Sequence, residues 1–76
     1  MSDMKFHTYF GLFVAKKRQM MNLSQAKLAE KVGISTRHCS DLENGKANLH
    51  IDTMMGFVNA LNLSMDEIIA DYNKAT

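Results

Sequence analysis

The residue types that most often carry out catalysis or bind metal ions are few in this chain and unfavourably spaced. His7, His38 and His50 show no metal-ligand spacing with one another, with Cys39 or with the acidic residues. His38 and Cys39 are neighbours on an expected helix, so their side chains diverge and cannot act as a base and its nucleophile. No glycine-rich phosphate-binding loop is present. We therefore expect neither an enzyme nor a bound metal or other cofactor.

Basic side chains gather in the middle of the chain, where they could attract a polyanion. The formal net charge is only +1. Residues 16–46, however, carry seven Lys or Arg against three acidic residues, whereas residues 47–76 carry one Lys against four acidic residues. This division gives one face an attraction for polyanions that the total charge hides, although ordinary solvated charge produces the same pattern.

Length and composition indicate one small domain spanning residues 1–76. The 76 residues are 46% hydrophobic and include no proline, which suits a compact helical protein. A single cysteine cannot form an intrachain disulfide and fits a reducing compartment. No apolar run approaches the roughly 20 residues of a membrane span, and residues 1–5 lack the features of a signal peptide. We expect a soluble cytoplasmic protein without membrane association.

Hydrophobic periodicity and end signals predict five helices. Ser24 and Ser35 are good N-cap residues for the second and third helices, which stop at Gly33 and Gly45. Residues 64–67 form a capping box that opens the last helix. Helices of this length with short loops predict an all-α orthogonal bundle. The expected helices cover, in order, about residues 8–21, 25–32, 36–44, 51–61 and a segment from 65 onward.

The first helix carries two apolar stripes. Phe10, Val14 and Met21 form the inner one. Lys17 lies near the middle of this inner face, so we expect its methylenes to cover the core while its ammonium group reaches water or DNA. On the remaining helices the residues expected on apolar faces are Leu28, Ala29, Val32, Cys39, Leu42, Met54, Met55, Val58, Leu61, Ile68, Ile69 and Tyr72.

Residues 25–44 have the spacing of a helix-turn-helix. Ala29 must be small because the next helix crosses close above it. Gly33 supplies the positive φ of a tight turn, and Ile34 fills the angle between the two helices. Chance agreement at all seven positions is improbable. The matching positions are Leu28, Ala29, Val32, Gly33, Ile34, Cys39 and Leu42.

Three short segments carry a resemblance to a known family: residues 23–25, 28–35 and 42–46. They resemble the phage-repressor/Cro family, also called the xenobiotic-response-element family, over about residues 8–70. The resemblance implies a five-helix, lambda-repressor-like fold in which the third helix enters the major groove. It also implies a repressor-like or controller-like regulator that binds double-stranded DNA, usually as a homodimer on a two-fold symmetric operator.

The first turns of the third helix should face base edges in the groove. Arg37 is the strongest candidate for reading sequence, since its guanidinium can bond O6 and N7 of a guanine. Thr36 could contact a thymine methyl group or a phosphate. Asp41 could accept from a cytosine amine or instead pair with Arg37 one turn away. The expected base-contacting residues are Thr36, Arg37, Ser40 and Asp41.

Other groups are expected on the phosphate backbone, where contacts set the register of the protein on DNA. The resemblance matches Gln25 to a glutamine that binds the backbone, and its main-chain N–H is unpaired at the start of a helix. Asn44, Gly45 and Lys46 follow the third helix, and their amides and the Lys46 ammonium group could hold further phosphates.

Arg18 and Glu43 are expected to have a structural role. The resemblance implies that they meet as a partly buried ion pair between the first helix and the end of the third. Such a pair would hold the recognition helix at its angle.

A second apolar ridge suggests self-association. Phe6, Phe13 and Met20 repeat every seven residues along the first helix, offset from the inner stripe. We expect this ridge to pack mainly against the fifth helix. Any exposed remainder, together with Met65, Ile69 or Tyr72, is the candidate dimer surface.

One alternative function belongs to another class. A helix-turn-helix can serve as a protein–protein interaction module, of the antitoxin or coactivator kind, instead of binding DNA. The low net charge and the apolar ridge are compatible with that role. Strong salt dependence of duplex binding would favour DNA, whereas salt-insensitive capture of a protein would favour the module.

Overall fold

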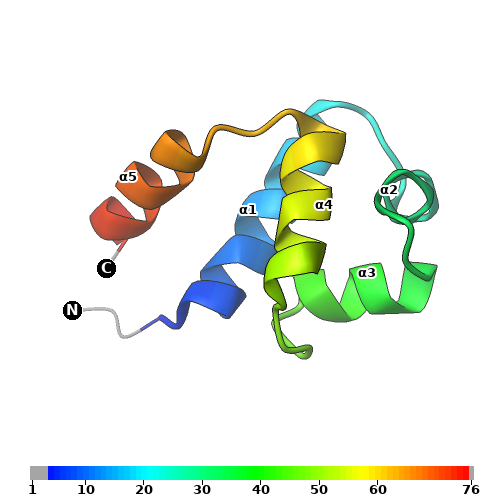
Figure 1. Cartoon of the computed structure of the whole chain (residues 1–76), viewed down its shortest axis with the longest axis horizontal. Helices are drawn as coiled ribbons and strands as arrows, with labels where there is room; N and C mark the ends of the chain where they lie inside the picture. Colours follow the sequence, from blue (N-terminus) through cyan, green and yellow to red (C-terminus); the bar gives the residue numbers. More distant parts are fainter. Residues whose placement is uncertain (1–3, 76) are drawn as a thin grey trace.

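The computed structural model describes residues 4–75 and builds them into five α-helices without a strand in that range (Figure 1). The predicted all-α five-helix bundle is therefore confirmed. Residues 1–3 and 76 lie outside the described part. The expectation that residues 1–5 lack the features of a signal peptide therefore falls mostly outside it. No helix among the described residues has the length and apolar character needed to cross a membrane. The helices are α1 (Phe6–Met20), α2 (Gln25–Val32), α3 (Thr36–Glu43), α4 (Ile51–Leu61) and α5 (Met65–Ala75).

Helices α1 and α4 form the centre of the molecule. Figure 1 shows α2 and α3 on one side of this pair and α5 on the other. Helix α3 packs against α1 and α2, and α2 packs against α4. Helix α5 packs against α1. The helix-turn-helix pair therefore lies at the opposite end of the bundle from α5.

All five helices contribute side chains to one hydrophobic core. Phe10 and Phe57 are each 1% exposed, and their rings meet edge to face with centroids 6.1 Å apart. Leu28, Cys39 and Ile68 bring in α2, α3 and α5 with no exposed area. Burying large side chains of this kind contributes roughly 1.5–3 kcal/mol each. The core accordingly holds α2 and α3 against the rest of the bundle.

Three residues expected on apolar faces are largely exposed. Ile69 is 51% exposed, although its neighbour Ile68 on α5 is fully buried. Met21 is 48% exposed, because α1 ends at Met20 and Met21 is its C-cap residue. Met55 is 41% exposed, and Phe57, which the pattern had not singled out, fills the core instead. Met21 thus lies beyond the end of its helix, whereas Met55 and Ile69 lie within helices whose packing partners leave them uncovered.

The second ridge of α1 packs against α5, as predicted, through aromatic side chains. Phe6 and Tyr72 meet edge to face, with ring centroids 5.2 Å apart. The Tyr9 hydroxyl donates to Asp71 Oδ2 over 2.6 Å, and burial together with this bond raises the Tyr9 pKa well above its usual range. Phe13 is buried, but Met20 at the end of the ridge is 66% exposed. The aromatic part of the ridge thus belongs to the core, and only its last residue remains free.

The ammonium group of Lys17 lies at the surface, in an exposed contact with α5, as the first of the two alternatives predicts. Its ammonium nitrogen lies 5.4 Å from the centroid of the Phe13 ring and 3.4 Å from Glu67 Oε2. A cation over an aromatic face is attracted by the negative potential of that face. Lys17 therefore joins α1 to α5 and does not point toward the helix-turn-helix end of the bundle.

Gly11 allows α1 and α3 to approach each other closely. A Cβ atom at this position would overlap the Leu42 carbonyl oxygen and would lie 3.0 Å from the Glu43 carbonyl oxygen. Both obstacles are backbone atoms, which cannot rotate away. Gly56 in α4 differs, because its nearest neighbour is the Val32 side chain, at 3.0 Å from such a Cβ.

We expect Gly11→Ala to destabilise the protein by roughly 3 kcal/mol, because α3 must shift to relieve the overlap. Urea unfolding measures the change. Gly56→Ala is the matched control, since its higher helix propensity, worth about 1 kcal/mol, opposes a contact that a side chain can relieve. Equal loss in the two variants would contradict the close approach of α1 and α3.

Candidate nucleic-acid interface

The turn between α2 and α3 has the geometry that the spacing predicts. Gly33 adopts a left-handed conformation with φ of 89°. The amides of Gly33 and Ile34 both donate to the Ala29 carbonyl, over 2.8 and 3.0 Å. The hydroxyl oxygens of Ser24 and Ser35 each accept from an amide in the first turn of their helix over 3.0 Å. Both predicted N-caps are thus confirmed, and they set where α2 and α3 begin.

Helix α3 buries one face and presents the other to solvent. Cys39, Leu42 and Glu43 are buried, whereas Thr36 and Arg37 in its first turn are exposed. The Arg37 side chain is 89% exposed, and its Nε lies 4.0 Å from Asp41 Oδ2. This distance is the outer limit of an ion pair, and at such exposure the attraction is weak. Arg37 is therefore free to reach a partner outside the protein.

Asp41 and Ser40 lie one turn farther along α3, and each is half-buried. The Ser40 hydroxyl accepts from Asn44 Nδ2 over 3.4 Å. The four residues expected to contact bases thus follow one another along the outer side of α3.

The loop after α3 corrects one expectation. Its backbone amides are already bonded within the chain: Asn44 N to Ser40 O over 3.0 Å, Gly45 N to Leu42 O over 3.2 Å, and Lys46 N to Asp41 O over 2.8 Å. Gly45, with φ of 72°, makes this tight reversal possible. Of these three residues, Asn44 and Lys46 keep exposed side chains that can donate to a phosphate.

Arg18 and Glu43 meet in a two-pronged ion pair between α1 and α3. Arg18 Nε donates to Glu43 Oε2 over 2.7 Å, and Nη2 donates to Oε1 over 3.1 Å. The side chains are 13% and 5% exposed. Arg18 Nη1 also donates to the Leu23 carbonyl over 2.9 Å, and the bond to Glu43 raises the pKa of the guanidinium above its usual value. The pair thereby links α1, the loop before α2, and the end of α3.

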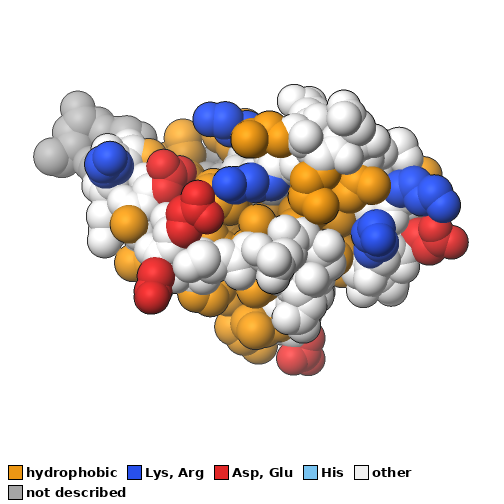
Figure 2. Space-filling view, turned by 90° about the horizontal axis from the view of Figure 1, so that it is seen from above, with side chains coloured by type: hydrophobic (Ala, Val, Ile, Leu, Met, Phe, Trp, Pro, Cys, Tyr) orange, Lys and Arg blue, Asp and Glu red, His pale blue; other side chains and the backbone are white. Residues whose placement is uncertain are grey.

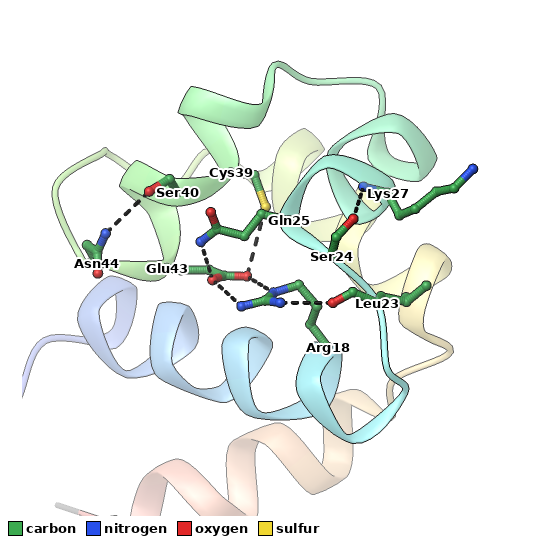
Figure 3. A network of polar contacts seen from close by, with 9 residues as sticks. All are labelled: Arg18, Leu23, Ser24, Gln25, Lys27, Cys39, Ser40, Glu43 and Asn44. Atoms are coloured by element: carbon green, nitrogen blue, oxygen red, sulfur yellow. Dashed lines mark hydrogen bonds and ion pairs between the residues drawn. The ribbon is translucent and has the colours of Figure 1, made fainter.

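Gln25 joins the same network, which the sequence reasoning missed. Its Nε2 donates to Glu43 Oε1 over 2.8 Å (Figure 3). Gln25 had been assigned to a phosphate alone, and no local pattern connects it with a carboxylate 18 residues away on another helix. The Cys39 thiol lies 3.9 Å from Glu43 Oε2, and burial raises its pKa to about 11. A thiol of this kind is largely protonated and inert at neutral pH.

The comparisons with known proteins agree with this geometry. The model of the helix-turn-helix family matches residues 14–68. The chain belongs to the helix-turn-helix family. No match was found among curated proteins.

Two solved structures share the fold. The clp gene regulator ClgR from C. glutamicum superimposes with a TM-score of 0.86 at 18% identity, over 97% of this chain and 96% of that one. The restriction-modification controller protein C.AhdI from Aeromonas hydrophila gives a TM-score of 0.74 at 24% identity, over 80% and 92% of the two chains. The predicted lambda-repressor-like architecture is thereby confirmed.

The helix-turn-helix family consists of DNA-binding transcription regulators, which are not enzymes. This chain is accordingly a DNA-binding regulator of that class. Residues 4–75 include no group of three or more His, Cys, Asp or Glu side chains placed to hold a metal ion. In this helix-turn-helix protein, the polar residues to consider for contact with DNA are those on and around α2 and α3.

Arg18→Ala should lower the free energy of unfolding by roughly 3 kcal/mol, because it leaves the buried Glu43 carboxylate without its cation. DNA affinity should fall with it, since α3 loses its support. Urea unfolding and duplex binding measured on the same preparation check both effects. Lys27→Ala is the control for stability: its ion pair with Glu30 is 3.5 Å long and largely exposed, so we expect no measurable loss. An unchanged melting temperature in Arg18→Ala would count against the role of the pair.

Proposed function

We propose that this protein is a sequence-specific transcription regulator, a repressor or controller, that binds double-stranded DNA as a homodimer on a two-fold symmetric operator. The observation that carries the proposal is the exposed first turn of α3, with Thr36 and Arg37 on a helix whose other face is buried. A helix held in this way can enter the major groove and bring its first side chains to the bases.

Arg37 is the main base-reading residue in this proposal. A guanidinium bonded to O6 and N7 of one guanine discriminates against other bases by about 1–3 kcal/mol. The contact of Arg37 with Asp41 at 4.0 Å is long enough to yield to a base, and the carboxylate can then orient the guanidinium. Thr36 and Ser40 supply hydroxyl groups on either side.

Phosphate contacts come from both helices of the motif. Gln25 lies at the first turn of α2, where residues 4–75 provide no acceptor for the amides of Gln25 and Ala26. Asn44 and Lys46 supply side-chain donors beyond the end of α3. The distribution of charge also favours an approach to DNA with the end away from α5. Figure 2 shows acidic side chains gathered over the α5 end, with most Lys and Arg side chains toward the middle and the other end. On the face that Figure 2 shows, the end away from α5 is thus the better one for a polyanion.

The two structural neighbours support a role in gene control, since one is named a gene regulator and the other a controller protein. A homodimer would place two recognition helices about 34 Å apart, one turn of B-DNA. Its interface must be self-complementary, because the two-fold axis brings the same surface of both copies together.

Ile69 is the centre of the proposed dimer surface. It is 51% exposed on α5. Met20, the exposed end of the ridge, borders a shallow hollow with Glu67 and Asp71. Two residues along a helix correspond to about 200° of rotation, so Ile69 faces away from that hollow. Tyr72 is engaged within the chain, since its ring packs on Phe6. The sequence-based patch therefore divides between two sides of α5, and we assign the interface to the Ile69 side.

Selection of random duplex DNA on the wild-type protein should enrich an inverted repeat. Arg37→Ala should lose or relax the preference at one position in each half-site while keeping salt-dependent affinity for bulk DNA. Sequencing of the selected pools checks both results. Lys16→Ala, a cation outside the motif, is the control and should select the same repeat. No enrichment at low salt, together with salt-insensitive capture of a protein, would favour the interaction-module alternative.

Ile69→Glu should convert the dimer to a monomer in sedimentation experiments, because it buries a charge at the two-fold axis. Met20→Glu, which changes an exposed side chain at the end of α1 beside the hollow that Ile69 faces away from, should leave the dimer intact. A wild-type protein that sediments as a monomer at high concentration, with and without DNA, would refute the homodimer.

A further inference from the structure

The Glu43 carboxylate is surrounded by donors and cannot itself reach DNA. It accepts from Arg18 Nε and Nη2 and from Gln25 Nε2, and the Cys39 thiol lies 3.9 Å from Oε2. The residue is 6% exposed. Any effect of Glu43 on DNA binding must therefore act through one of these partners, and Gln25, half-buried at the start of α2, is the partner that we expect at a phosphate.

Gln25 has unused hydrogen-bonding capacity after it binds Glu43. A glutamine amide carries two N–H donors and one acceptor oxygen. One N–H is directed at Glu43 Oε1 over 2.8 Å, which fixes the plane and rotation of the amide group. The second N–H remains available. A free glutamine side chain samples many rotamers, and ordering it on binding would cost conformational entropy.

The positive charge of Arg18 is also needed to orient Gln25. A carboxylate one hydrogen bond away from Gln25 would repel a DNA phosphate if it were unpaired. The two bonds from Arg18, at 2.7 and 3.1 Å, neutralise Glu43 and keep it available as an acceptor for Gln25. The network therefore presents a neutral, oriented amide in place of a carboxylate.

We propose that Glu43, neutralised by Arg18, is a positioning residue for DNA-backbone binding: it holds the Gln25 amide so that the second N–H binds a phosphate. The proposal rests on the function proposed above and names the device by which one of its phosphate contacts is oriented. It gives the ion pair a role in binding that is separate from its role in stability.

The test compares two proteins that both lack the ion pair. Replacing a buried ion pair by uncharged residues is often neutral for stability. Arg18→Met/Glu43→Leu removes the acceptor of Gln25, whereas Arg18→Met/Glu43→Gln keeps a side-chain carbonyl that can accept from it. Gln25→Ala is introduced into the wild type and into each of these two double variants. The probe is a fluorescent 20-base-pair duplex of arbitrary sequence at low salt, because phosphate contacts do not depend on base sequence. Circular dichroism and urea unfolding establish that each variant is folded.

In the wild type, Gln25→Ala should weaken duplex binding roughly tenfold, the effect of one hydrogen bond to a charged group. Arg18→Met/Glu43→Leu should lose a similar factor, and adding Gln25→Ala to it should change the affinity less than about twofold. Arg18→Met/Glu43→Gln should recover most of the affinity. Equal affinities of these two double variants, or a full effect of Gln25→Ala in both, would overturn the proposal. Absence of any salt-dependent duplex binding by the wild type would instead refute the proposed function.

A second measurement does not depend on how the variants fold. In NMR spectra of the wild-type protein, addition of duplex DNA should shift the side-chain amide signals of Gln25. If backbone amides at the start of α2 respond to DNA while both side-chain protons of Gln25 do not, the proposal is wrong.

Discussion

The buried carboxylate of Glu43 is the constraint on which the arrangement of α1, α2 and α3 depends. A carboxylate with 5% of its side chain exposed is tolerated only when it is paired and hydrogen-bonded. Its partners come from α1, α2 and α3, so the three helices must meet at one place for its charge to be satisfied. The network therefore does more than link two residues: it defines how the recognition helix sits on the rest of the bundle.

The same end of the molecule combines tight packing with an open outer face. Gly11 lets the backbone of α1 lie against the end of α3, and Leu28, Cys39 and Leu42 fill the space beneath. Because the inner face of α3 is occupied in this way, Arg37 and Thr36 must project outward. The exposure of these two side chains, which we propose read the bases, is thus a consequence of what the other face of the helix buries.

The opposite end relies on a different kind of contact. Aromatic rings of Phe6, Tyr9 and Tyr72 join α5 to α1, and the Tyr9 hydroxyl is bonded to Asp71. Lys17 adds a cation over the Phe13 ring and an ion pair with Glu67. Of these residues, periodicity had marked Phe6 and Phe13 as part of a ridge on the first helix. The contacts leave Met20 exposed at the end of α1 and Ile69 exposed on α5.

Local sequence signals determined the five helices, the caps at Ser24 and Ser35 and the turn at Gly33, because these features depend on residues within one or two helical turns. They also pointed to the burial of Ala29 and Cys39. Only the tertiary structure decided that Gln25 binds Glu43, that the amides of Gly45 and Lys46 are already bonded, and that Lys17 turns toward α5. Each of these contacts depends on distances between separate helices or on the path of a loop. Helical periodicity predicts which side of a helix is apolar, but it does not say which neighbour will cover that side or how closely it will approach.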